Sequence, residues 1–303
     1  MAAEPHAAAP ASPPAPDADL ATPASVTLEA EHVSAWNRRF AVRLADGAEV
    51  EAVLYRGDTL CVSCQVGCAV RCPFCASGAA GLARPLSLDE LKGQVHAVEA
   101  RGHALAGVTV SGVGEPLHNP VAVEAFIRWC HARGTRVTLT TSGGPIARLD
   151  AFLRDVPHQG LTLSVHAGTE PVRARLVPHA PDLASLFSTL AAALPTLTRR
   201  RRKRIALAYL LLAGENDGDA ELDAFAARAR PLGVSVHLYA HNAVPTSELG
   251  SPGRAAYEAA HARLVEAGLT VRMSSQARLE ANGGCGTLVA LRTAARPGAL
   301  PIR

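Results

Sequence analysis

The chain has 303 residues, 48% of them hydrophobic, and a formal net charge of +3. This length and composition support one large folded domain or two modest ones, which excludes a chain that is disordered throughout. No apolar run is long enough to span a membrane, so we expect no membrane association. Aromatic residues make up 4% of the chain, which argues against extensive stacking on nucleic-acid bases.

Residues 1–24 are mainly Ala and Pro, with almost no large apolar side chain. Such a segment buries too little apolar surface to offset the entropy of ordering, so we expect a disordered tail. It also lacks the positively charged start and apolar core of a secretory signal, and we therefore expect a cytoplasmic protein. In a reducing cytosol, clustered cysteines serve more often as metal or catalytic ligands than as disulfide partners.

The segment 25–60 alternates polar and apolar side chains and contains Asp46-Gly47, a common hairpin turn. It predicts a short N-terminal β-hairpin ahead of the main domain. Glu49 and Glu51 would lie on one face of its second strand, because side chains alternate along a strand.

After this segment, short apolar stretches rich in Val, Leu and Thr each precede a helical pattern. The predicted strands are residues 59–66, 107–113, 136–142, 160–166, 204–212 and 234–240. The predicted helices start with a capping box at Ser87 and Glu90 and continue at 120–133, 145–154, 182–194, 219–230 and 254–267. Strands linked in this way pair in parallel, and six units are fewer than the eight of a closed barrel. The predicted fold class is therefore α/β, a partial (β/α)6 TIM-like barrel over residues 61–290, followed by a C-terminal tail, 291–303.

Polar or glycine-rich residues follow the carboxyl ends of the predicted strands. Besides the cysteines after the first strand, they are residues 111–116, 140–144, 164–168 and 239–242. Active sites of parallel barrels are built at this rim. The pattern therefore predicts one shared site.

Five of the seven cysteines lie within residues 61–75. Cys68, Cys72 and Cys75 have the spacing C-x3-C-x2-C, which lets a short loop place three thiolates around one metal centre. Structural zinc usually takes four protein ligands, often as two separated pairs, and no second pair follows in the sequence. A 4Fe–4S cluster held by three cysteines keeps one iron free for another ligand. We therefore predict a 4Fe–4S cluster.

This loop resembles that of the radical S-adenosylmethionine (SAM) enzymes. The surrounding sequence, CVSCQVGC, is similar to the pattern C-V-S-S-Q-V-G-C of the RlmN/Cfr family of radical SAM RNA adenine methyltransferases, also called methyl synthases. The resemblance continues in the family's order through GVGEPLHN, VTLTTSGG, LSVHAGTEPVRARLVP, AYLLLAGEND, YAHNAVP and GGCG. It covers about residues 45–290 and implies the radical SAM type of partial barrel.

The resemblance implies that Cys68, Cys72 and Cys75 hold the cluster, whose open iron binds the amino and carboxylate groups of SAM. The positions that match the family's SAM contacts are Gly114, Glu115, Ser142, Ser164, Val165, His166 and Asn242. A carboxylate suits the ammonium group of SAM, and hydroxyl or amide groups suit its ribose and adenine. Taken singly, these residues also have structural interpretations, such as a turn glycine, a helix cap or a core histidine.

The resemblance also implies a mechanism that uses two SAM molecules. One methylates Cys285, and the other supplies the radical that removes hydrogen from the S-methyl group, whose carbon then adds to adenine. Glu51 lies in VEAVLY, a segment similar to that around the family's catalytic glutamate, and would remove the ring proton. Cys61 would then attack the sulfur of the adduct and leave a Cys61–Cys285 disulfide. The implied partners are a thiol reductant and an electron donor such as flavodoxin or ferredoxin.

The implied substrate is carbon 2 of an adenine in 23S ribosomal RNA, transfer RNA or both. Two alternatives stay open: the same chemistry at carbon 8 or on another heteroaromatic substrate, and a non-catalytic iron–sulfur paralogue that binds RNA or senses redox state. The basic run Arg199–Arg204 fits either contact with RNA phosphates or a solvated face. Cys130 is expected to pack within a helix, and the role of Cys64 stays open.

Overall fold

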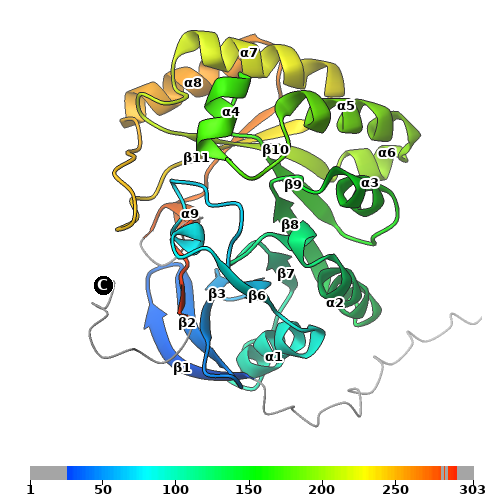
Figure 1. The fold of residues 1–303 in the computed structure, drawn as a ribbon, viewed down its shortest axis with the longest axis vertical. Coiled ribbons are helices and arrows are strands. Elements are labelled where there is room, and N and C mark those ends of the chain that lie inside the picture. Colours follow the sequence, from blue (N-terminus) through cyan, green and yellow to red (C-terminus); the bar gives the residue numbers. More distant parts are fainter. Residues whose placement is uncertain (1–25, 281–282, 284–285, 292–303) are drawn as a thin grey trace, which may run out of the picture.

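The computed structural model describes residues 26–280, 283 and 286–291, and Figure 1 shows their arrangement. Eleven of the described strands form one large sheet in the order β1-β2-β3-β4-β7-β8-β9-β10-β11-β12, with β13 paired to β3. The strands are β1 (Val26–Val33), β2 (Asn37–Leu44), β3 (Glu49–Tyr55), β4 (Thr59–Val62), β7 (Gly107–Val110), β8 (Arg136–Thr141), β9 (Gly160–Ser164), β10 (Ile205–Leu211), β11 (Ser235–Ala240), β12 (Val271–Met273) and β13 (Ala290–Leu291). The predicted tail 1–24 lies outside the described residues, as does 291–303 apart from Leu291 in β13.

From β4 to β12 in this order, every pair of neighbouring strands is parallel. Within the described part of the chain β12 does not pair with β4, so the sheet curves into an open barrel. The predicted partial barrel is confirmed. It has one strand more than the six predicted, because the three residues of β12 are too few to give a recognisable pattern.

The N-terminal strands extend the barrel sheet. The predicted turn at Asp46-Gly47 joins β2 to β3, where the Asp46 carboxylate accepts the Ala48 N–H at 3.0 Å and Gly47 has φ +81°. The structure adds β1 on one side of this hairpin, and on the other side β3 pairs antiparallel with β4. The hairpin is therefore part of a three-stranded antiparallel extension that is continuous with the parallel strands.

Helices cover the outer face of the barrel. The predicted ones are present as α1 (Leu88–Glu99), α2 (Pro120–Ala132), α3 (Ile146–Arg154), α5 (Leu183–Ala193), α7 (Asp219–Ala229) and α8 (Arg254–Glu266). The structure adds the short helices α4 (Glu170–Leu176), α6 (Arg199–Arg202) and α9 (Gln276–Leu279), and the 3-10 turns η1 (Ala76–Gly78), η2 (Pro116–His118), η3 (Leu194–Thr196) and η4 (Arg230–Leu232). The capping box of α1 is formed in both directions, since Ser87 Oγ accepts the Glu90 N–H and Glu90 Oε2 accepts the Ser87 N–H.

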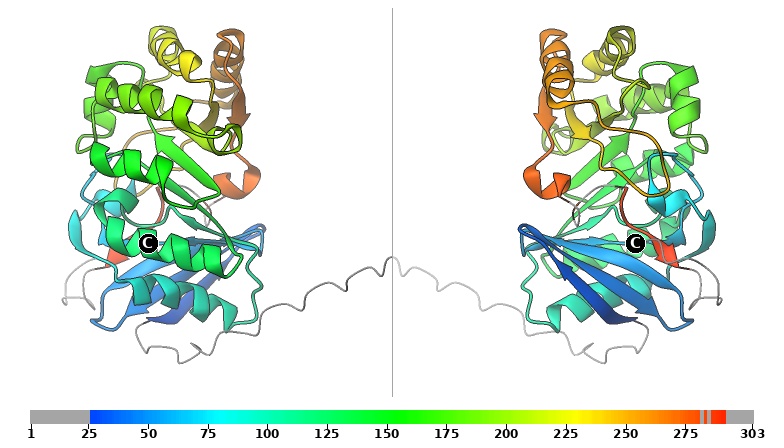
Figure 2. Two further views of the ribbon diagram at one scale, coloured as in Figure 1. Left: turned by 90° about the vertical axis from the view of Figure 1, so that its right-hand side faces the viewer. Right: turned by 90° about the vertical axis from the view of Figure 1, so that its left-hand side faces the viewer.

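Figure 2 shows the antiparallel strands at one end of the molecule and helices α7 and α8 at the other. One large core cluster joins the two ends, because the barrel strands and the inner faces of the helices contribute buried side chains to it. In the described part of the chain, none of the helices combines the length and the apolar character that crossing a bilayer requires.

Candidate active site

The loop that carries Cys68, Cys72 and Cys75 is closed at its base by a separate two-stranded sheet, β5 (Gln65–Gly67) and β6 (Leu82–Pro85). The predicted first strand, 59–66, is therefore wrong beyond Val62. The chain leaves the barrel at Ser63, whose backbone N–H and C=O both bind the side-chain amide of Gln94 at 2.9 Å.

A glycine is required at the point where this loop begins. Gly67 has φ +82°, and a Cβ there would lie 1.9 Å from the carbonyl oxygen of Gly81. The next residue, Cys68, donates its N–H to that same carbonyl at 3.2 Å. The close approach of the two backbones at Gly67 and Gly81 thus fixes both ends of the cysteine loop.

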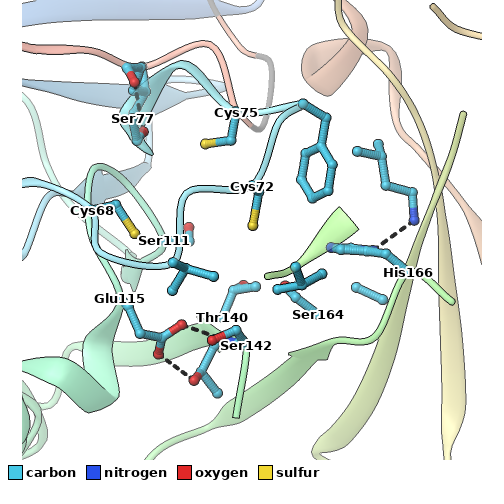
Figure 3. Close-up of a pocket in the computed structure, with 18 of the residues that line it drawn as sticks. Cys68, Cys72, Cys75, Ser77, Ser111, Glu115, Thr140, Ser142, Ser164 and His166 are labelled. Atoms are coloured by element: carbon cyan, nitrogen blue, oxygen red, sulfur yellow. Dashed lines mark hydrogen bonds between the residues drawn. The ribbon is translucent and has the colours of Figure 1, made fainter. Parts of the chain in front are cut away.

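The three thiols face one cavity (Figure 3). Burial raises the pKa of Cys68 to about 12 and that of Cys72 well above its usual value, and the neighbouring thiols add to both shifts. Within the described residues, no three Cys, His, Asp or Glu side chains are close enough to share one ion. In a cluster held by three cysteines each thiolate binds a different iron, so the thiols need not converge on one point. The arrangement fits a cluster.

Glu115 joins the carboxyl ends of β7 and β8. One of its carboxylate oxygens accepts from the Thr141 hydroxyl and the Leu117 N–H, and the other accepts the Ser142 N–H at 2.7 Å (Figure 3). Ser142 Oγ lines the cavity and has no hydrogen-bond partner among the described residues, although it is buried. A bound polar group is therefore its natural partner.

Gly114, next to Glu115, also lines the cavity and has φ +113°. A Cβ there would lie 2.7 Å from Cβ of Gln65, whose side-chain oxygen accepts the Glu115 N–H at 2.8 Å. The glycine thus forms a turn and leaves the cavity wall free of a side chain at this position.

Ser164 and His166 line the cavity at the carboxyl end of β9. His166 Nδ1 accepts the Leu210 N–H at 2.9 Å, and its ring meets Phe74 of the cysteine loop edge to face at 5.3 Å. Burial, with Arg173 nearby, lowers the pKa of His166 to about 3, so the imidazole is neutral. The ring therefore links the cysteine loop to the barrel by packing and hydrogen bonding.

Two predicted SAM contacts lie farther from the cavity. The side chain of Val165 is fully buried in the main core, so only its backbone faces the rim. The side-chain amide of Asn242 donates to the carbonyl oxygen of Arg278 at 2.9 Å and so holds α9 beside β11.

Arg173 of α4 is a site residue that the sequence analysis missed. It is 2% exposed, and its guanidinium donates to the carbonyl oxygens of four rim residues at 2.6–3.2 Å. These residues are Ser142, Ser164, Val165 and Pro181. Burial lowers the pKa of Arg173 to about 10. Its position inside the quoted stretch LSVHAGTEPVRARLVP was the available signal, but an arginine on a helix usually lies in solvent.

Glu51 and Cys61 lie on the same face of β3 and β4. Val53 and Cys61 are opposite each other across the pair, and Glu51 points to the same side as Val53. Cys61 Sγ lies 3.3 Å from the hydroxyl of Ser111, which lines the cavity. Glu51 is 14% exposed at its side chain and accepts the Val289 N–H at 2.8 Å. Burial raises the pKa of Glu51, against the opposing effects of this N–H and of Arg39.

Three described residues near the carboxyl end of the chain contact this face or the cysteine loop. The Tyr55 hydroxyl donates to the carbonyl of Gly283 at 2.8 Å, and the Ala76 N–H in the cysteine loop donates to the carbonyl of Gly286 at 2.8 Å. Ser77 Oγ in turn donates to Leu288 O at 2.7 Å. The predicted methyl-carrying Cys285 lies outside the described residues, but the described glycines on both sides of it contact the site.

The basic run Arg199–Arg204 lies elsewhere. It precedes β10 and so stands at the amino ends of the strands, opposite the cavity. Arg201 donates to the carbonyl oxygens of Phe152, Leu153 and Val156, and Arg204 to that of His158. Part of the run therefore holds the fold together at the far rim.

The chain is similar in sequence and in structure to known proteins. The family model of the Radical SAM superfamily matches residues 62–226, a span from the end of β4 into α7. The match implies the cofactors of that superfamily, a 4Fe–4S cluster and SAM. The three thiols and the unpartnered Ser142 hydroxyl fit these two groups.

Two relatives carry the name dual-specificity RNA methyltransferase RlmN. The protein from Sorangium cellulosum is 38% identical over 77% of this chain, and the chain spans 62% of that relative's length. The protein from Halorhodospira halophila is 34% identical over 86% of this chain and 74% of its own length. A crystal structure of a radical SAM methyltransferase from Sphaerobacter thermophilus superposes with a TM-score of 0.78 and 29% identity, covering 87% of this chain and 81% of that one. The chain therefore belongs to the radical SAM superfamily and, within it, to the RlmN family of RNA methyltransferases.

Proposed function

We propose that the protein methylates an adenine in ribosomal or transfer RNA at carbon 2, through a methylated cysteine. One arrangement carries the proposal. Glu51 and Cys61 share a face of β3 and β4, and the residues flanking Cys285 lie over that face beside the three-thiol cavity.

When bound, the cluster and SAM supply a 5'-deoxyadenosyl radical, which is the hydrogen acceptor that the chemistry needs. Cys285 carries a methyl group taken from a first SAM molecule, and loss of one hydrogen atom lets that carbon form a bond to the adenine. The radical adduct must also lose one electron, for which the oxidised cluster would be the acceptor, and Glu51 accepts the proton from the attacked ring carbon. Because its pKa is raised, its carboxylate is a stronger proton acceptor than that of an ordinary glutamate.

Cys61 then releases the product. Its thiolate attacks the sulfur of Cys285, so that a sulfur–sulfur bond forms while the bond between sulfur and carbon breaks. The electron pair of the broken bond stays on the carbon, which takes up a proton and becomes the methyl group on the base. A thiol reductant restores both cysteines. The hydroxyl of Ser111, 3.3 Å from Cys61 Sγ, is placed to donate a hydrogen bond to this thiolate.

The experiment is reaction of anaerobically reconstituted protein with bulk RNA and methyl-labelled SAM, followed by mass spectrometry of the nucleosides. We expect labelled 2-methyladenosine. Labelled 8-methyladenosine would move the reaction to the other ring carbon, and RNA without label would refute the proposal. In parallel, the Cys61→Ala variant should accumulate a covalent protein–RNA adduct that the Cys130→Ala variant does not form, since Cys130 is buried in α2.

A further inference from the structure

The turn between β1 and β2 presents an aromatic surface to solvent. Trp36 is 48% exposed and Val33 is 59% exposed, which is unusual for side chains of this size. The guanidinium carbon of Arg56 lies 6.0 Å from the Trp36 ring centroid, at cation–π distance. Together with Ser34 and Asn37 these side chains line a shallow surface pocket. We call Trp36 and Arg56 the platform.

Arg56 has a backbone conformation that arginine normally avoids. Its φ is +51° and that of Gly57 is +79°, as in a tight hairpin turn, and the Asp58 N–H returns to the Tyr55 carbonyl at 3.1 Å. Such turns usually place Asn, Asp or Gly at this position because left-handed conformations strain larger residues. In the described part of the chain two other non-glycine residues have positive φ, Arg71 in the cysteine loop and His166 at the cavity. Strain retained at such positions points to use of the side chain.

The platform is joined to a residue that lines the cavity. Its turn is paired with Tyr55, which lines the cavity, because Asn37 is the cross-strand partner of Tyr55 and Arg56 N–H donates to the Trp36 carbonyl at 2.8 Å. The Glu280 carboxylate also holds the turn, accepting from the Ser34 hydroxyl at 2.6 Å and from the Trp36 N–H at 3.3 Å. The platform is therefore fixed relative to the site on two sides.

The charged side chains around the platform differ in their partners. Arg38 is paired with Glu31 at 2.6 Å, and Glu280 accepts hydrogen bonds from the turn itself. Arg56, by contrast, makes no ion pair within the described residues, so its guanidinium is available to a phosphate. An exposed indole and an adjacent guanidinium are the two groups that hold an unpaired nucleotide, by stacking on its base and pairing with its phosphate.

We infer that Trp36 and Arg56 bind an unpaired nucleotide of the RNA substrate next to the one that enters the cavity. The base stacks on Trp36, and Arg56 contacts the phosphate that leads toward Tyr55. This inference rests on the proposed RNA substrate and assigns a site of recognition outside the chemistry.

The first test measures contact directly. The chain has two tryptophans, and Trp129 packs against Phe126 and His96, so the Trp129→Phe variant isolates the fluorescence of Trp36. Titration of this reconstituted variant with short oligoadenylate and with bulk transfer RNA should quench the fluorescence to saturation, whereas duplex RNA of the same length should quench weakly. Binding detected by anisotropy without quenching would overturn the inference. Quenching by a flavodoxin and not by RNA would assign the surface to a protein partner, which also overturns it.

The second test measures affinity. We expect Trp36→Ala to raise the Kd for oligoadenylate by about tenfold and Trp36→Phe to change it by less than about threefold. Arg56→Ala should weaken binding. It should also reduce the slope of log Kd against log salt concentration by about one, because one phosphate contact is lost. The matched controls are Val121→Ala, which removes a side chain 78% exposed on α2, and Arg202→Ala in α6; both should leave the Kd unchanged. Equal effects of Trp36→Ala and Val121→Ala would refute the platform.

The two proposals fail separately. Quenching and the Trp36→Ala effect without any methylated nucleoside would retain the platform and refute the methyl transfer. If RNA is methylated but the Kd is unchanged in Trp36→Ala and Arg56→Ala, the methyl transfer is retained and the platform is refuted. Circular dichroism of each variant shows whether the fold is retained, as expected for two side chains that face solvent.

Discussion

The backbone N–H of Val289 donates to Oε2 of Glu51 at 2.8 Å and so joins the glycine-rich segment to the strand that carries the proposed base. This bond stabilises the ionised form of the carboxylate, but burial has the larger effect and raises the pKa of Glu51 above its ordinary value. The Glu51 carboxyl group therefore titrates at a higher pH than that of an exposed glutamate.

The raised pKa of Glu51 predicts how the reaction depends on pH. A base acts in its ionised form, so methyl transfer to RNA should rise with pH through the raised pKa and then level off. Glu51→Gln should abolish RNA methylation, while mass spectrometry still finds the S-methyl group on Cys285. Glu49→Gln is the matched control, since Glu49 lies on the same strand and pairs with Arg43 at 3.3 Å. An equal loss in the control would contradict the assignment of Glu51.

The raised pKa of Glu51 also makes the free energy of unfolding depend on pH. Between the ordinary pKa of a glutamate and the raised pKa of folded Glu51, the folded state binds more protons than the unfolded state. The free energy of unfolding should therefore fall as pH rises through that window and stay constant above it. In urea titrations at several pH values, Glu51→Gln should show a smaller fall than the native protein. A steeper fall in the variant would show that the sign is wrong.

The iron content of cysteine variants shows which cysteines bind the cluster. We propose Cys68, Cys72 and Cys75 as the three cluster ligands, so replacing any one of them by serine should leave reconstituted protein colourless and nearly free of iron. Cys64→Ser changes a buried thiol in the same stretch and should retain the iron. A Cys64→Ser protein without iron would mean that Cys64 takes part in cluster binding.

Gly67 and Gly47 have nearly the same φ, so comparing their alanine variants separates backbone strain from steric conflict. Gly67 and Gly47 have φ +82° and +81°, but an added Cβ has an overlapping neighbour only at Gly67, the carbonyl oxygen of Gly81. Both alanine variants should lose about 1 kcal/mol of stability from the left-handed conformation. Gly67→Ala should in addition displace the cysteine loop and lower the iron bound per chain. Equal iron content in the two variants would refute this role of Gly67.

Arg173 predicts a large structural effect from one side chain. Arg173→Met leaves the carbonyl oxygens that it binds without a donor, and we expect a loss of about 3 kcal/mol or more in the free energy of unfolding. Arg175→Met, two residues along α4, removes an exposed ion pair with Glu215 and should cost about 0–1 kcal/mol. Urea denaturation of both variants tests the difference. Similar losses would show that the buried guanidinium is not what holds the rim together.

Much of the fold was predictable because its signals are local. The capping box at Ser87 and Glu90 and the turn at Asp46-Gly47 depend on neighbouring residues alone, and both are present. The separation of β4 from β5 was not predictable, because residues 59–66 contain no Gly, Pro, Asn or Asp to mark a break. What divides them is the side chain of Gln94, which binds the backbone of Ser63 from a helix far along the chain.

The candidate site also contains some residues that the sequence could identify and others that it could not. The cysteine spacing and the rim residues Glu115 and Ser142 follow from short motifs, and the structure brings them to one cavity. Arg173 could not be recognised as a buried group, since its burial depends on carbonyl oxygens from three separate loops. For Val165, the match to a contact motif did not reveal that the side chain is buried in the main core, so that only the backbone faces the rim.

The bonds from Ala76 and Ser77 to Gly286 and Leu288 set an order of events during synthesis. The ribosome makes the cysteine loop about two hundred residues before the segment that covers it, as the sequence positions require. A nascent chain therefore carries the cysteine loop before Gly286 and Leu288 have been added to it. The loop acquires these two contacts only when the last part of the sheet has been made.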